Sequence, residues 1–133
     1  RLFGFEFEPD KMTKLLGLTP TKTGKKGEEY FTGPSKNRTK NWEYNHWEYE
    51  SKKITQEYIG EFISAFFEEI IKPRLGILKK ISKKCPTMRL VIVQYYYDGF
   101  NPQYNLTKEQ LKMLADISGE VQFDIYCLNP SAK

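Results

Sequence analysis

The sequence has few of the residues from which catalytic and metal sites are built. It contains one histidine, His46, and two cysteines, Cys85 and Cys127, in 133 residues. The two cysteines are far apart and match no metal-binding or redox spacing. A secreted domain of this size more often carries several disulfide pairs. We therefore expect no metal, no cofactor, reduced thiols and a cytoplasmic protein.

Membrane and nucleotide-binding motifs are missing as well. No apolar run approaches the roughly 18 residues that indicate a membrane span, so we expect no membrane contact. The segment Gly24-Lys25-Lys26-Gly27 lacks the remainder of a glycine-rich phosphate loop. Because Arg1 already lies in an expected strand, we expect further residues upstream, and the lack of a signal peptide excludes no compartment.

Aromatic residues are plentiful, at 15% of the chain, and the length fits a single domain that spans residues 1–133. Hydrophobic periodicity and capping residues predict strands at 2–8, 41–51, 87–98 and 120–128, and helices at 9–16, 54–72, 74–84 and 107–118. The polar segment 18–41 predicts a long loop or irregular hairpin, which either hides a short strand near Tyr30 and Phe31 or is mobile.

This order of elements favours an α+β fold. Helices would pack on one face of a small mixed sheet, with a ferredoxin-like arrangement as one option. The apolar positions of strands and helix predict one core, formed by Phe3, Phe5, Phe62, Phe66, Val91, Val93, Phe123 and Ile125.

Several segments together resemble a known bacterial family. They are Glu8-Pro9-Asp10-Lys11-Met12, Leu16-Gly17-Leu18-Thr19-Pro20-Thr21, Gly27, Trp47 with Ser51, Leu106-Thr107, and Gly119-Glu120-Val121-Gln122-Phe123-Asp124-Ile125-Tyr126. On these residues the chain is similar to bacterial domain of unknown function 4279. The resemblance implies a stand-alone bacterial protein of this size and no particular activity. Immunity proteins that neutralise toxins are an analogy from other small families.

Alternation places a set of candidate binding residues on the open face of the sheet. That face would be acidic with aromatic points, and its residues are Glu6, His46, Trp47, Glu48, Asp124 and Tyr126. The segment 18–41 carries six basic residues against two acidic ones, and it adds Lys25, Lys26 and Arg38 as candidates for phosphate contact. A solvated face with no partner is the alternative.

Catalysis is the less favoured hypothesis. Cys127, His46 and Asp124 form a nucleophilic triad on paper, but alternation points Cys127 and Asp124 to opposite faces. The leading hypothesis is a non-enzymatic bacterial domain that binds an unidentified protein partner, with a homodimer left open. The alternatives are a nucleic-acid or phosphate-ligand binder that uses the loop lysines, and a small hydrolase that uses Asp124 and His46.

Overall fold

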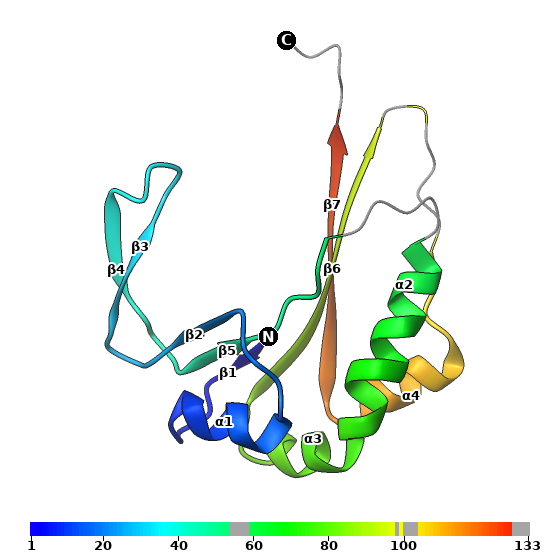
Figure 1. The fold of residues 1–133 in the computed structure, drawn as a ribbon, viewed down its shortest axis with the longest axis horizontal. Helices are drawn as coiled ribbons and strands as arrows, with labels where there is room; N and C mark the ends of the chain where they lie inside the picture. The colour runs from blue at the N-terminus through cyan, green and yellow to red at the C-terminus, as the bar shows by residue number, and fades with distance from the viewer. Residues whose placement is uncertain (54–58, 98, 100–103, 129–133) are drawn as a thin grey trace.

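The computed structural model describes residues 1–53, 59–97, 99 and 104–128 (Figure 1). The first part contains strand β1 (Leu2–Phe3), helix α1 (Pro9–Leu16) and strands β2 (Lys22–Gly24), β3 (Glu29–Thr32), β4 (Arg38–Asn41) and β5 (His46–Glu48). A broken helix follows, made of α2 (Ile59–Phe66), the π-helical turn η1 (Phe67–Ile71), the 3-10 turn η2 (Lys72–Arg74) and α3 (Leu75–Ser82). Strand β6 (Thr87–Tyr97), helix α4 (Lys108–Asp116) and strand β7 (Gly119–Leu128) complete the described part.

The main sheet has five strands in the order β2-β5-β1-β6-β7. Neighbours pair antiparallel except β6 and β7, which run parallel and are joined through α4. A helical connection is what a parallel pair needs, because its strands start at the same end. Strands β3 and β4 form a separate antiparallel hairpin. The predicted mixed α+β fold is confirmed. Its strand order is not ferredoxin-like, because β6 and β7 are consecutive, adjacent and parallel.

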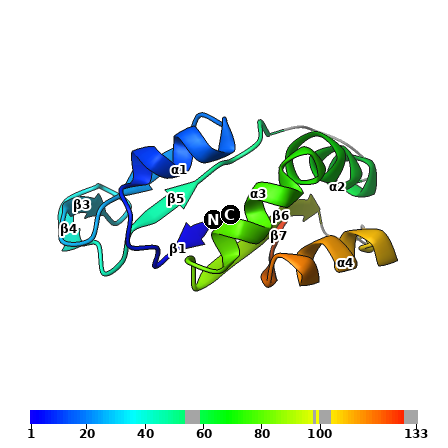
Figure 2. The ribbon, with the colours of Figure 1, turned by 90° about the horizontal axis from the view of Figure 1, so that it is seen from below.

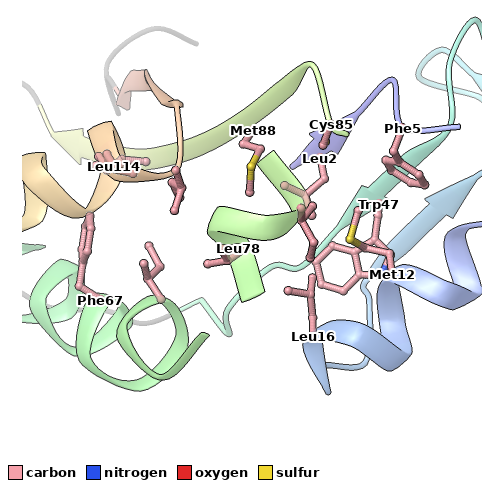
Figure 3. Close-up of a cluster of buried hydrophobic side chains, with 14 of the residues drawn as sticks. Leu2, Phe5, Met12, Leu16, Trp47, Phe67, Leu78, Cys85, Met88 and Leu114 are labelled. Atoms are coloured by element: carbon pink, nitrogen blue, oxygen red, sulfur yellow. The ribbon is translucent and has the colours of Figure 1, made fainter. Parts of the chain in front are cut away.

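The hydrophobic core lies on the face of the sheet that carries Leu2, Trp47 and Met88 (Figure 3). We call it the inner face, and the opposite one the outer face. Buried residues of α1, α2, η1, α3 and the end of α4 pack against the inner face: Met12, Leu16, Ile63, Phe67, Ile71, Leu78, Ile81, Leu114 and Ile117. Seen from below, the four α-helices spread across the lower end of the molecule (Figure 2). In the described part of the chain, no helix is long and apolar enough to cross a membrane.

The predicted core was wrong at five positions: Phe3, Val91 and Val93, which lie on the outer face of the sheet, and Phe123 and Ile125. Phe123 and Ile125 do lie on the inner face, but each is 46% exposed. Figure 1 shows the reason, since the upper halves of β6 and β7 rise beyond the helices. Alternation assigns side chains to a face, but it does not say how far along the strand that face is covered. Phe5 is buried as predicted, at 2% exposed.

The first strand is much shorter than the predicted 2–8. Gly4 has a positive φ of 81°, which ends the extended conformation after Phe3. The backbone beyond it is held by Asn45, whose side-chain amide donates to the carbonyl oxygens of Phe5 and Phe7 at 2.9 and 3.1 Å. Glu6 therefore lies outside the sheet, and its predicted place on the sheet face is wrong.

The broken helix has a local cause in Pro73. Proline has no N–H and excludes the carbonyl one turn earlier, at Glu69, from helical bonding. Arg74 replaces the missing donor, because its Nη1 donates to the carbonyl oxygens of Glu69 and Ile70 at 3.2 and 3.0 Å. Its Nε donates to the Leu16 carbonyl at 2.8 Å. One arginine thus satisfies the distorted turn and ties it to the end of α1.

Candidate functional site

A row of four rings crosses the lower part of the outer face. Tyr30 stacks on Trp42 at 4.3 Å between ring centroids, Trp42 stacks on His46 at 4.8 Å, and His46 contacts Phe3 at 4.7 Å. The Nζ of Lys22 lies over the Trp42 ring at 5.2 Å. The row connects hairpin β3–β4 to the sheet, which fits the predicted irregular hairpin with a strand at Tyr30 and Phe31.

Gly24 allows this close stacking. Any Cβ at this position would overlap the Trp42 ring. Only glycine therefore lets the Trp42 indole lie flat against β2 and reach His46. The rings of the row pack against one another and leave the His46 side chain only 4% exposed. His46 is consequently not the open surface residue that the sequence predicts.

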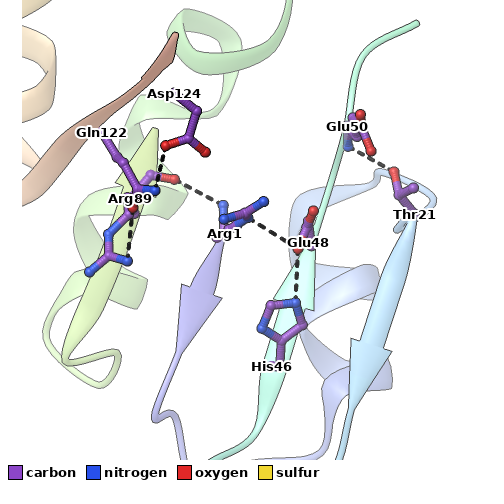
Figure 4. A network of polar contacts seen from close by, with 8 residues as sticks. All are labelled: Arg1, Thr21, His46, Glu48, Glu50, Arg89, Gln122 and Asp124. Carbon is purple, nitrogen blue, oxygen red and sulfur yellow. Dashed lines mark hydrogen bonds and ion pairs between the residues drawn. The ribbon is translucent and has the colours of Figure 1, made fainter. Parts of the chain in front are cut away.

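His46 and Glu48 form the polar centre of the outer face (Figure 4). Glu48 Oε2 lies 3.0 Å from His46 Nε2 and 3.3 Å from Arg1 Nε. Burial lowers the pKa of His46 below its ordinary value, and the hydrogen bond and charge of Glu48 oppose that change. His46 is therefore neutral at pH 7. Its Nδ1 is buried, and no residue in the described part of the chain forms a hydrogen bond with it.

The predicted acidic face is largely neutralised by arginine. Arg89 binds Glu120 Oε2 through Nε and Nη2 at 3.1 and 3.0 Å, and its Nη1 donates to Gln122 Oε1 at 3.3 Å. Gln122 Nε2 in turn donates to Asp124 Oδ1 at 2.8 Å. Asp124 thus lies on the outer face as predicted, within a chain of hydrogen bonds that runs along β6 and β7 (Figure 4). The face carries the predicted acidic groups Glu48 and Asp124, with Arg1 and Arg89 beside them.

The residues of the hypothetical triad do not come together. His46 is on β5 and Asp124 on β7, and strands β1 and β6 lie between them in the sheet. Cys127 pairs with Tyr96 across the β6–β7 ladder and points to the face opposite Asp124. Trp47, another candidate, is 3% exposed in the core, where its Nε1 donates to Thr13 Oγ1 at 3.0 Å. Among the described residues, no three acidic, histidine or cysteine side chains are grouped to hold a metal ion.

The loop candidates have different surroundings. Lys25 Nζ pairs with Glu8 at 2.8 Å, and the backbone N–H of Lys26 donates to Asn45 Oδ1 at 2.8 Å. Arg38 is exposed on β4, where every residue is exposed. The basic residues of segment 18–41 are therefore spread over the hairpin and its base.

A larger feature opens along β6. Beyond Arg89, whose backbone N–H donates to the Arg1 carbonyl at 2.9 Å, no described strand pairs with the β1 side of β6. A cleft of about 880 Å³ lies there. Its lining comes from three places: β6 and β7 with Val93, Gln94, Tyr95, Asp124 and Tyr126; the segment Tyr49 to Lys53; and α2 with Ile59, Phe62 and Phe66.

The cleft is mostly apolar with a few polar groups. Tyr95 and Tyr126, opposite each other on neighbouring strands, stack at 5.1 Å. The side-chain oxygen of Gln94 is buried and has no hydrogen-bond partner among the described residues. Sequence reasoning named Asp124 and Tyr126 but missed Tyr95 and Gln94. The sequence feature that could have identified this part of the cleft was the run Tyr95-Tyr96-Tyr97, which puts a large ring with a polar tip on both faces of one strand.

The fold and cleft define a small α+β domain with an open sheet edge and no assembled catalytic group among the described residues. A family model described as domain of unknown function (DUF4279) matches residues 1–128, and the chain belongs to this family. Neither the curated proteins nor the solved structures contain a match to the chain.

Proposed function

We propose that the protein is a non-enzymatic bacterial interaction domain that binds an extended polypeptide segment in the cleft beside β6. The observation that carries this proposal is the cleft itself, in which an edge of β6 that no described strand pairs meets apolar side chains. An added strand gains backbone hydrogen bonds along the edge and pockets for alternate side chains. The volume of about 880 Å³ is within the range of binding sites.

Two details support a polypeptide ligand. The buried oxygen of Gln94 needs a donor, and a backbone or side-chain N–H of an inserted segment would supply one. The ladder between β1 and β6 is antiparallel at Leu2–Met88 and Phe3–Thr87, and no described strand lies beside the part of β6 beyond Arg89. The exposed thiol of Cys127 fits a reducing compartment, and we propose a cytoplasmic location.

The test is a selection of extended peptides from a random library, followed by affinity measurement. Tyr95→Asp places a charge in the cleft and should weaken the selected peptide about tenfold or more. Tyr44→Asp is the matched control, because Tyr44 is 59% exposed and does not line the cleft. On binding, hydrogen exchange should slow at Leu90 to Gln94.

Two further arms can overturn the proposal. A version of the chain with additional residues upstream of Arg1 is tested in parallel, and loss of peptide binding in that form would show that the cleft is filled intramolecularly. A fluorescent single-stranded oligonucleotide tests the alternative of a nucleic-acid binder. Oligonucleotide binding that disappears in Arg38→Glu, with no peptide binding to the wild type, would favour the hairpin lysines instead.

A further inference from the structure

The two edges of the main sheet differ in how well they are protected. Edge strand β2 has three residues and carries Lys22, and both features discourage pairing with another sheet. Edge strand β7 has ten residues, with neither lysine nor proline. No described strand pairs with the edge of β7 that points away from β6. A long edge of this kind promotes association unless a partner covers it.

The exposed apolar side chains of β7 lie on both faces of the strand. Phe123 and Ile125 are on the inner face and Tyr126 and Leu128 on the outer face, and each is between 41% and 48% exposed. A partner that docks flat on the sheet would cover one face only. A strand added along the edge contacts both faces, because its own side chains alternate in the same way. The exposure therefore favours pairing along the edge.

We propose that this edge is covered by β7 of a second copy of the chain, in antiparallel pairing about a two-fold axis at Ile125. The exposed positions run from Phe123 to Leu128. A two-fold axis at Ile125 lies near the middle of this range, so the paired strands cover most of it. Phe123 then faces Cys127 of the second copy, and both lie on inner faces. A pairing of equal strands closes on itself and uses up the edge in both copies.

The acidic side chains of β7 favour the same position for the two-fold axis. The charged residues on β7 are Glu120 and Asp124. A two-fold axis at Asp124 would place two carboxylates directly opposite each other, which is destabilising. An axis at Ile125 places Asp124 opposite Tyr126, where the phenol can donate to the carboxylate, and leaves Glu120 with Arg89 of its own chain.

The dimer uses a different strand edge from the proposed function, because the cleft opens on the β1 side of β6 and the paired edge is the far side of β7, although Asp124 and Tyr126 border both surfaces. Pairing of the two edges would join the five-stranded sheets into one continuous sheet. The β1-side edge of β6 would stay open in both copies, so one dimer would present two peptide sites.

Light scattering after gel filtration, over a range of protein concentrations, gives the first test. We expect twice the chain mass of 15.7 kDa at the higher concentrations. Ile125→Lys sets two ammonium groups opposite each other and should raise the dissociation constant about tenfold or more. Leu111→Lys, on the exposed side of α4, is the matched control and should leave the dimer unchanged. Circular dichroism checks that both variants fold.

A cysteine at the proposed axis tests the register. In Ile125→Cys with Cys127→Ser, two facing residues would lie about 4.5–5.5 Å apart between Cα atoms, within reach of a disulfide. We expect rapid covalent dimer formation under mild oxidation, and little from Leu111→Cys in the same background. A monomeric mass at every concentration without cross-linking would overturn the proposal. So would a dimer that survives Ile125→Lys, since its interface would lie elsewhere.

Discussion

The distorted turn after α2 predicts a difference in stability between two adjacent phenylalanines. Phe67 begins the π-helical turn and is 1% exposed in the core. Phe66 is the last residue of α2 and is half-buried, with its ring 6.3 Å from that of Tyr49 beside the cleft. The two side chains are chemically identical, so the pair isolates the effect of position.

The magnitudes follow from burial. Truncation of a fully buried phenylalanine to alanine costs about 3–5 kcal/mol, because it removes apolar contacts and leaves a cavity. A half-buried ring loses roughly half of that transfer energy and leaves an open groove rather than a cavity, so we expect about 1–2 kcal/mol. Phe67→Ala should therefore be the more destabilising by about 2 kcal/mol.

Urea unfolding, followed by circular dichroism, measures both variants against the wild type. The slope of the unfolding free energy against urea concentration should be the same in both variants and the wild type, so that a shift of the midpoint reports a change in stability alone. Equal costs, or a larger cost for Phe66→Ala, would contradict the helical register of the structure. That outcome would restore the register that the sequence predicts, in which Phe66 points into the core.

Three other predictions concern local features. Thr107→Ala removes the N-cap of α4 and should cost about 1 kcal/mol in urea unfolding. Gly24→Ala should disturb the Trp42 ring and change tryptophan fluorescence, whereas Gly76→Ala, on the exposed side of α3, should stabilise by up to about 1 kcal/mol. His46 has a lowered pKa, so the unfolded chain binds its proton first as the pH falls. Its contribution is fully present above about pH 6.5 and is lost below it. Urea midpoints at about pH 7.5 and 5.5 should therefore differ less in His46→Gln than in the wild type.

Local signals in the sequence predicted the start of α4 and the end of α1 correctly. Thr107 accepts from the backbone of Gln110 at 3.2 Å, while the Gln110 side chain accepts from the backbone of Thr107 at 3.0 Å, as the predicted capping box requires. Gly17 adopts the left-handed conformation with φ of 62° at the end of α1. These features depend on residues within one turn of each other, so their chemistry can be read directly from the chain.

Features that depend on distant residues were not predictable in the same way. The predicted strand 2–8 alternates well, but Asn45 holds the backbone after Gly4 in another path. His46 was expected at the surface because strand alternation shows neither that Trp42 folds back onto its ring nor that the distant Phe3 contacts it. The exposed half of β6 and β7 follows from helix length and placement, which periodicity does not report.

The arrangement of charge separates the cleft from the hairpin as binding surfaces. In the sheet, Arg1 pairs with Glu48 and Arg89 with Glu120, so the acidic groups that the sequence exposes are compensated. An occupant of the cleft would then be selected by backbone hydrogen bonds and apolar contacts, which salt affects little. The hairpin instead keeps Arg38 and its basic neighbours in solvent, where attraction for an acidic group is strong only at low salt. If one partner uses both surfaces, the hairpin would set the rate of encounter, and the cleft would set the lifetime of the complex.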